Sequence, residues 1–232
     1  VGGVDLAETT DLCNATAQIL TEDEFIYLQA YFIAEDHLAR NSERDKQDYR
    51  RMTNLATGDR ITSEVIIITP GSYVRKEYVS AWFVLLRDEY KISFLKIGYD
   101  RALSKEWLTD MQEHGFSHEK VHRDSETGSI TRDLGVLTEV AQGGWTLSEP
   151  IKVVKSLFES GKIVADVRNK LFAYCLYNLK IRQDVNNNLS PHKAKSTGHI
   201  DGAVGVFNAF VAYQRAKEMP LYANRIGQLF RI

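Results

Sequence analysis

The first part of the chain has the pattern of apolar and polar positions that is typical of β-strands. Residues 2–7 and 12–20 are short apolar stretches, and residues 24–33 continue with alternating aromatic and aliphatic side chains. A polar turn, Thr21-Glu22-Asp23, separates the second stretch from the third. Because strands joined by short turns pair with each other, this pattern predicts a three-strand antiparallel meander.

Strand and helix patterns alternate from residue 63 onward. Pro70-Gly71 ends the first of these strands, and Gly115 ends the second helix. In order, the pattern predicts a strand at 63–69, a helix at 74–86, a strand at 92–99 and a helix at 104–114. Strands that alternate with helices pair in parallel and are covered by those helices. We therefore expect an α/β fold with a mixed sheet, in which the meander is joined by parallel strands.

The second half of the chain predicts more helix than strand. Residues 124–140 contain a polar, turn-rich excursion, and residues 180–195 form two arms around the turn Asn186-Asn187-Asn188, as in a hairpin. The other elements predicted here are a helix at 146–160, a strand at 163–165, a helix at 171–179 and a final helix at 200–217.

Charged residues crowd into one early segment, 42–52, and are otherwise unevenly distributed. Ser42 is a good N-cap, so we expect this segment to be an exposed helix with a solvated face. Residues 1–36 contain eight acids and no Lys or Arg, whereas residues 152–217 contain eleven Lys or Arg and four acids. The acidic part is suited to cations and the basic part to phosphates, although solvated surfaces of opposite sign explain the charges equally well.

Length and composition narrow the class of protein. The chain has 232 residues, of which 44% are hydrophobic and 26% charged, as in a globular protein, and we expect one domain over residues 1–232. Its apolar runs are far shorter than the roughly 18 residues that a membrane helix needs. The two cysteines, Cys13 and Cys175, lie far apart and indicate neither a disulfide framework nor a thiolate zinc site. This cysteine usage favours a reducing, intracellular setting. Because the chain opens on an apolar strand without Met, we expect an upstream portion to be missing.

Three aspartates stand within or at an end of apolar elements. Asp5 lies within the first strand, Asp100 follows the strand at 92–99, and Asp201 opens the last helix. If the two strands are parallel neighbours, their aspartates emerge at the same edge of the sheet, and the helix brings Asp201 to them. Oxygen ligands without His or Cys suit Mg²⁺ or Mn²⁺, and two such ions support phosphodiester hydrolysis. Asp11 is a candidate outer-shell partner; each aspartate alone is more often a cap or turn residue.

Other catalytic motifs are missing from the sequence. Lys195-Ser196-Thr197 lacks the glycines of a phosphate-binding loop, so ATP hydrolysis by this chain is not expected. No G-x-S-x-G or H-E-x-x-H motif occurs. His114, His118 and His122 are spaced at four, but Gly115 breaks the helix that would align them, which argues against a metal site there.

Four motifs occur in the order found in one known family and cover essentially the whole chain. The sequence resembles the C-terminal nuclease domain of the large terminase subunit of tailed bacteriophages. The motifs are Val1-Gly2-Gly3-Val4-Asp5-Leu6-Ala7 through Asp11-Leu12, Ile97-Gly98-Tyr99-Asp100-Arg101, Gln142-Gly143 leading into Leu147-Ser148-Glu149-Pro150, and Pro191-His192-Lys193-Ala194-Lys195-Ser196 leading into Ile200-Asp201-Gly202.

The resemblance implies an RNase H-like fold and a metal-dependent endonuclease. Such an enzyme cuts concatemeric double-stranded phage DNA during genome packaging, with two Mg²⁺ or Mn²⁺ ions. Asp5, Asp100 and Asp201 match the family's catalytic acidic triad, and Lys193 and Lys195 match basic residues suited to the DNA backbone. The resemblance also implies an ATPase domain upstream in the same polypeptide, a portal protein and a small terminase subunit as partners, and the cytoplasm of an infected bacterium as the location.

Two features depart from the family pattern. The residue before Ile200, often basic in the family, is His199 here, and the excursion at 124–140 is longer than in relatives. The Asn-rich turn suggests a separate hypothesis, that a hairpin lies on DNA with four flanking cations, Lys180, Arg182, Lys193 and Lys195.

Two rival interpretations remain open. Another RNase H-like nuclease, such as a junction resolvase or an integrase, would share the acidic cluster but would prefer branched DNA. A non-catalytic module that binds DNA or docks on the portal would use the aspartates only structurally, and it would show no metal-dependent cleavage.

Overall fold

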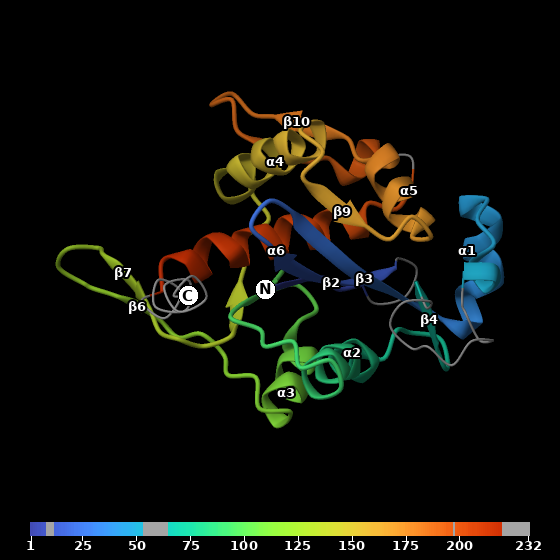
Figure 1. Cartoon of the computed structure of the whole chain (residues 1–232), viewed down its shortest axis with the longest axis horizontal. Helices are drawn as coiled ribbons and strands as arrows, with labels where there is room; N and C mark the ends of the chain where they lie inside the picture. The colour runs from blue at the N-terminus through green and yellow to red at the C-terminus, as the bar shows by residue number, and fades with distance from the viewer. Residues whose placement is uncertain (8–11, 53–64, 197, 220–232) are drawn as a thin grey trace.

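A seven-stranded mixed sheet forms the centre of the molecule (Figure 1). The computed structural model describes residues 1–7, 12–52, 65–196 and 198–219. The strands run in the order β4-β3-β2-β1-β5-β8, and β9 pairs with the first part of β3. Their bounds are β1 (Gly2–Asp5), β2 (Cys13–Leu20), β3 (Phe25–Ala34), β4 (Ile66–Thr69), β5 (Ile97–Tyr99), β8 (Leu137–Glu139) and β9 (Ile163–Ala165).

The pairing confirms the predicted mixed sheet. β1, β2 and β3 form an antiparallel meander, whereas β1–β5, β5–β8, β3–β4 and β3–β9 are parallel pairs. Its central strands are buried along most of their length, because helices cover both faces of the sheet. The fold is therefore RNase H-like, as the resemblance implied.

Helices form layers on the two faces of the sheet. In Figure 1, α6 (Asp201–Lys217) crosses one face, and α4 (Gly144–Glu159) and α5 (Lys170–Asn178) pack over it. The other face carries α2 (Lys76–Asp88) and α3 (Lys105–Glu113), whose aromatic side chains fill a core with the sheet. None of the described helices is long and apolar enough to span a membrane.

Glycines let α6 lie directly on β1. A Cβ atom added to Gly3 would overlap the backbone of Gly205, and one added to Gly205 would overlap the Asn14 side chain. The Asn208 side chain on α6 also donates a hydrogen bond of 2.7 Å to the Val4 carbonyl. This close contact fixes the first residue of α6 relative to the end of β1.

The charged segment at 42–52 differs from its prediction. The helix α1 (Leu38–Asp45) begins earlier, with His37 rather than Ser42 at the N-cap position, and ends at Lys46, whose φ is 53°. Two short 3-10 helices flank it, η1 (Glu35–His37) and η2 (Tyr49–Met52). Leu38 and Asn41 are buried at i and i+3, and Asp45 continues that face at i+7, so the prediction of a solvated helix was wrong for this side.

The two predicted excursions are hairpins. A hairpin of β6 (Val121–Arg123) and β7 (Ile130–Arg132) projects from the body, and the rest of the segment 124–140 returns to the core as β8, which the prediction missed. The segment 180–195 forms β10 (Ile181–Gln183), β11 (Leu189–Pro191) and the 3-10 helix η3 (Lys193–Lys195), as expected for two arms around a turn.

Candidate active site at the carboxyl edge of the sheet

Asp5 and Asp100 end two neighbouring parallel strands. Val4 lies beside Tyr99 in the β1–β5 register, so the next residues along both strands, Asp5 and Asp100, emerge at the same edge. Asp5 is buried, with 7% of its surface exposed. Asp100 is half-buried, and its Oδ1 accepts a hydrogen bond of 3.2 Å from the Ala102 amide. The expectation that these strands are parallel neighbours is confirmed.

Asp201 is the first residue of α6 and is almost completely buried, with 1% of its surface exposed. Its Oδ2 lies 3.0 Å from Nδ1 of His199. Its Oδ1 is buried and has no hydrogen-bond partner among the described residues. A buried carboxylate oxygen without a donor is costly, and such an atom is well suited to a bound cation.

The negative charges of Asp5 and Asp201 both raise the pKa of two buried thiols, Cys13 and Cys175. Burial is the main reason why the pKa of Cys13 rises to about 11, and the negative charges of Asp5 and Asp201 raise it further. The pKa of Cys175 is also raised, mainly by burial, with further contributions from both carboxylates. The two aspartates therefore share one neighbourhood at this edge, although they are 196 residues apart (201 minus 5) in sequence.

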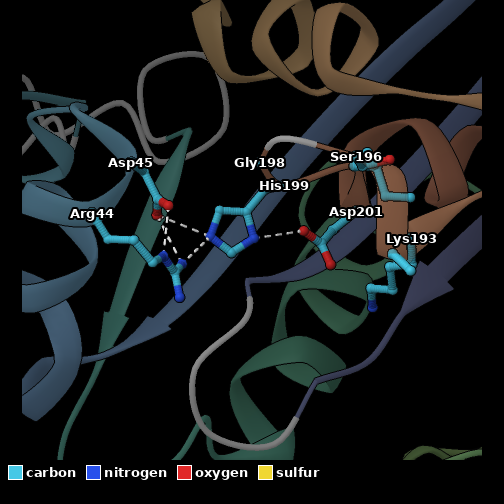
Figure 2. Close-up of a pocket in the computed structure, with 9 residues that line it drawn as sticks. Arg44, Asp45, Lys193, Ser196, Gly198, His199 and Asp201 are labelled. Atoms are coloured by element: carbon cyan, nitrogen blue, oxygen red, sulfur yellow. Dashed lines mark hydrogen bonds and ion pairs between the residues drawn. The ribbon is translucent and has the colours of Figure 1, made fainter.

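His199 links Asp201 to a second buried acid, Asp45 at the end of α1. Its Nε2 lies 3.0 Å from Asp45 Oδ2, and Figure 2 shows the ring between the two carboxylates. Burial lowers the pKa of the His199 ring, but hydrogen bonds with Asp201 and Asp45 outweigh burial and raise it to about 9. Burial raises the pKa of Asp45, but hydrogen bonds from His199, Arg44 and Tyr49 outweigh it and hold that pKa well below its usual range.

A cavity of about 450 Å³ opens beside this cluster (Figure 2). It gives access to the start of α6, and its wall carries both acids, Asp45 and Asp201, and cations, Arg44 and Lys193. Its lining residues are Arg44, Asp45, Lys193, Ala194, Ser196, Gly198, His199, Ile200 and Asp201.

The four predicted DNA-contacting cations fall into two groups. Lys193 and Lys195 lie exposed on η3, and Lys193 lines the cavity. Lys180 and Arg182 are exposed at the first arm of the hairpin, where Arg182 donates a hydrogen bond of 2.8 Å to Ser190. The structure thus brings Lys193 to the acidic edge and places Lys180 and Arg182 on the hairpin.

The three aspartates are not a ready-made metal cage. Among the residues that the structure describes, no group of three or more His, Cys, Asp or Glu side chains is arranged to hold a metal ion. Asp5 and Asp201 share their surroundings, whereas Asp100 is bonded within its own turn. Asp11, the candidate outer-shell residue, lies outside the described residues.

Sequence reasoning missed two buried groups at this edge. Asp45 has only 5% of its side chain exposed, and its signal was the i+7 spacing from Leu38. Lys76, at the start of α2, is 8% exposed; its ammonium group donates to the Ala7 carbonyl and lies 3.8 Å from the Cys13 sulfur. The sequence carried no local signal for Lys76, because its contacts are 63 and 69 residues away.

The donor chemistry of this edge fits a hard divalent cation. Asp201 offers a buried oxygen that has no donor in the described part of the chain, and Asp5 and Asp100 add oxygen atoms at the same edge. Mg²⁺ and Mn²⁺ prefer such ligands.

Residues 126–218 match the family model of the terminase large subunit, endonuclease domain. That stretch includes Asp201 and the whole of α6. The resemblance to terminase large subunit nucleases is confirmed. The match begins after Asp5 and Asp100, so it does not include them. No curated protein sequence matches the chain.

Solved structures of two phage terminases share the fold. The HK97 bacteriophage large terminase superposes with a TM-score of 0.72 at 19% identity, over 91% of this chain and 38% of that chain. The large terminase nuclease from thermophilic phage G20c gives a TM-score of 0.50 at 12% identity, over 92% of this chain and 80% of that one. The G20c nuclease has also been solved with bound magnesium, at a TM-score of 0.49 and 12% identity, over 92% and 79%. This chain thus spans less than half of the HK97 protein.

Proposed function

We propose that this chain is the nuclease part of a terminase large subunit and cleaves double-stranded phage DNA during genome packaging. The observation that carries the proposal is the buried Oδ1 of Asp201, for which the described residues supply no partner, at the edge where Asp5 and Asp100 end parallel strands. The family match over 126–218 supports the same reaction class. Asp5, Asp100 and Asp201 are the proposed catalytic and metal-binding residues.

The chemistry follows from what the residues offer. Two Mg²⁺ or Mn²⁺ ions, held by the three aspartates, would activate water and stabilise the charge that develops on the phosphate. Asp201 is held by the start of α6 and by His199, and the cavity beside it is the proposed place for the DNA backbone. Lys193 on the cavity wall offers a positive charge to a phosphate next to the cleaved one.

The remaining parts of the proposal concern the whole protein. We assign this chain to one RNase H-like domain of a longer polypeptide that also carries an ATPase motor. A portal protein and a small terminase subunit are the proposed partners, and the cytoplasm of the infected bacterium is the proposed location.

Cleavage of supercoiled plasmid tests the reaction. We expect nicking with Mg²⁺ or Mn²⁺ and none with EDTA. Asp5→Asn, Asp100→Asn and Asp201→Asn should each lower the rate by roughly 10³-fold or more, because a metal site supplies several kcal/mol of transition-state stabilisation. Asp36→Asn, an exposed acid on η1, makes the same charge change away from the cavity and should cut normally.

Three outcomes would count against the proposal. Cleavage that survives all three substitutions would move the active site elsewhere. A preference for branched over linear duplex DNA would favour a junction resolvase. If the folded parent cuts with neither metal, a non-catalytic docking module would be the better explanation.

The salt dependence of binding to a DNA duplex tests the four cations. Each phosphate contact adds about 0.9 to the steepness of the slope of log K against log salt. The pairs Lys193→Ala/Lys195→Ala and Lys180→Ala/Arg182→Ala should therefore each reduce it by up to about 1.8. Lys105→Ala/Lys120→Ala removes two exposed charges on the α3 side and should leave the slope unchanged. An unchanged slope for the hairpin pair would remove the hairpin from the DNA path.

The fluorescence of a tryptophan next to the hairpin provides a second test of whether DNA lies along it. Trp145, at the start of α4, is 92% exposed, whereas Trp82 and Trp107 are buried. The neighbouring Gly144 packs against Asn188 in the hairpin turn. DNA that lies along the hairpin should therefore protect Trp145 from acrylamide quenching, and unchanged quenching would indicate that the duplex passes elsewhere.

A further inference from the structure

Three buried side chains, Asp45 at the end of α1 and His199 and Asp201 at the start of α6, form a continuous line that ends at Asp201. His199 Nδ1 lies 3.0 Å from Asp201 Oδ2, and His199 Nε2 lies 3.0 Å from Asp45 Oδ2. The exposed fractions of the side chains are 5% for Asp45, 4% for His199 and 1% for Asp201. Both ring nitrogens of His199 therefore have a carboxylate partner, and all three side chains are largely buried.

The far end of this line is itself held in place. Arg44 binds Asp45 with two nitrogens, Nε to Oδ1 at 2.7 Å and Nη2 to Oδ2 at 2.9 Å. The Tyr49 hydroxyl donates to Asp45 Oδ2 at 2.9 Å. A carboxylate with three donors in addition to the imidazole has little freedom to rotate, so it fixes the plane and position of the His199 ring.

The ring in turn selects which oxygen of Asp201 stays open. Because Nδ1 of His199 occupies Oδ2, the oxygen without a partner among the described residues is Oδ1. Without the imidazole, the carboxylate would be free to rotate about its χ2 angle and to exchange its two oxygens. The geometry thus presents one defined oxygen at the edge shared with Asp5.

We infer that Asp45 and His199 are positioning residues that hold Asp201 ready to bind the divalent cation. This inference rests on the proposed function, because Asp201 is a metal ligand only in that proposal. His199 is an unsuitable ligand itself, since neither nitrogen is free. Groups that orient a ligand in this way typically change metal affinity by about 10-fold to 100-fold when they are removed.

The test measures Mn²⁺ binding directly, by calorimetry or by electron paramagnetic resonance, on the intact chain without DNA. Asp201→Asn defines the loss of the site. We expect Asp45→Asn to weaken Mn²⁺ binding by about 10-fold to 100-fold. Asp36→Asn, an exposed acid just before α1, is the matched control and should bind as the parent does.

A pair of His199 variants separates positioning from a general structural role. Asn can place its amide nitrogen where Nδ1 of His stands, so His199→Asn keeps a donor to Asp201 but loses the link to Asp45. We expect His199→Asn to bind Mn²⁺ more tightly than His199→Ala. In the His199→Ala background, Asp45→Asn should have no further effect, because the line to Asp201 is already broken.

The outcomes distinguish this inference from the function on which it rests. If Asp45→Asn is folded and binds Mn²⁺ as the control does while Asp201→Asn has lost binding, the positioning role is wrong and the metal site stands. Additive effects of Asp45→Asn and His199→Ala would also overturn it. If the parent binds no better than Asp201→Asn, the metal site itself fails. Should Asp45→Asn not fold, the His199→Asn and His199→Ala pair decides alone.

Discussion

Two buried carboxylates, Glu119 and Asp201, lie near opposite ends of α6 and differ in how completely their oxygens are hydrogen-bonded. Glu119 Oε1 accepts from Lys96 at 2.5 Å, and its Oε2 accepts from Arg132 at 2.5 Å and from Thr138 at 2.7 Å. The side chains of Lys96 and Glu119 are each 1% exposed. Every oxygen of this carboxylate therefore has a donor.

Asp201 is as deeply buried but only half satisfied. His199 binds its Oδ2, and its Oδ1 has no partner in the described part of the chain. An unmet buried acceptor costs about 1–3 kcal/mol, so a fold is expected to keep one only where it has another use. The comparison teaches that burial of an acid does not by itself mark function; at Asp201 the unmet oxygen points to function because it lies in the same neighbourhood as Asp5.

The largest effect is expected on thermal stability and Mn²⁺ binding: replacing Glu119 should mainly lower stability, and replacing Asp201 should mainly abolish metal binding. Glu119→Gln leaves the Lys96 charge buried without a counter-charge and should cost about 3–5 kcal/mol of unfolding free energy. For a chain of this length that corresponds to a fall in Tm of about 6–20 °C. Asp201→Asn should lower Tm less, because it removes a charge whose Oδ1 was unmet. Thermal unfolding and Mn²⁺ titration of both variants check this.

The metal titration gives the other half of the contrast. Glu119→Gln should retain Mn²⁺ binding at a temperature where it is folded, and Asp201→Asn should lose it. A double variant, Lys96→Met/Glu119→Gln, should recover part of the lost stability, because the uncompensated ammonium is gone. Equal losses of stability for Glu119→Gln and Asp201→Asn would break the comparison.

A smaller effect is expected where α6 touches β1. Gly3→Ala would force a Cβ atom into the backbone of Gly205 and Ala209, which cannot move without shifting the helix. Overpacking of this kind costs about 1–3 kcal/mol. Because the shift would also move Asp201 away from Asp5, Mn²⁺ binding should weaken together with stability, unlike in Glu119→Gln.

Gly143→Ala is the control for this prediction. A Cβ atom at Gly143 meets nothing within 4 Å, and its φ of −89° is open to any residue. Chemical denaturation and Mn²⁺ titration of both variants should show a large change for Gly3→Ala only. A Gly3→Ala protein with normal stability and metal binding would show that α6 does not depend on this close contact.

Local patterns revealed most of the sheet and the helices but little of the network around the site. The meeting of Asp5 and Asp100 at one edge could be predicted because each stands at an apolar strand and alternating strands and helices indicate parallel pairing. Asp45 was assigned to a solvated helix, because its partner His199 lies 154 residues away. Likewise, Glu119 depends on Lys96, 23 residues earlier, and on a hairpin that reads as a polar loop. Buried pairing across such separations leaves no periodic signal in the sequence.

The smallest of the expected effects is a loss of the stabilisation by Glu119 at acid pH. Burial raises the pKa of Glu119, but hydrogen bonds from Lys96, Thr138 and Arg132 outweigh it and lower that pKa below its ordinary value of 4.5. A carboxyl group whose pKa is lower in the folded state stabilises the fold above its unfolded pKa, and this contribution is lost as the pH falls through the folded pKa.

The difference in unfolding free energy between the parent and Glu119→Gln should thus be full near pH 7 and shrink below about pH 4.5, by no more than about 1.4 kcal/mol per pH unit. Urea unfolding of both proteins from pH 7 to pH 3 measures it, with the exposed Glu113→Gln as a control that should stay within about 0.5 kcal/mol of the parent. A difference that stays constant to pH 3 would mean that the charge on Glu119 contributes nothing and that its burial is supported by packing alone.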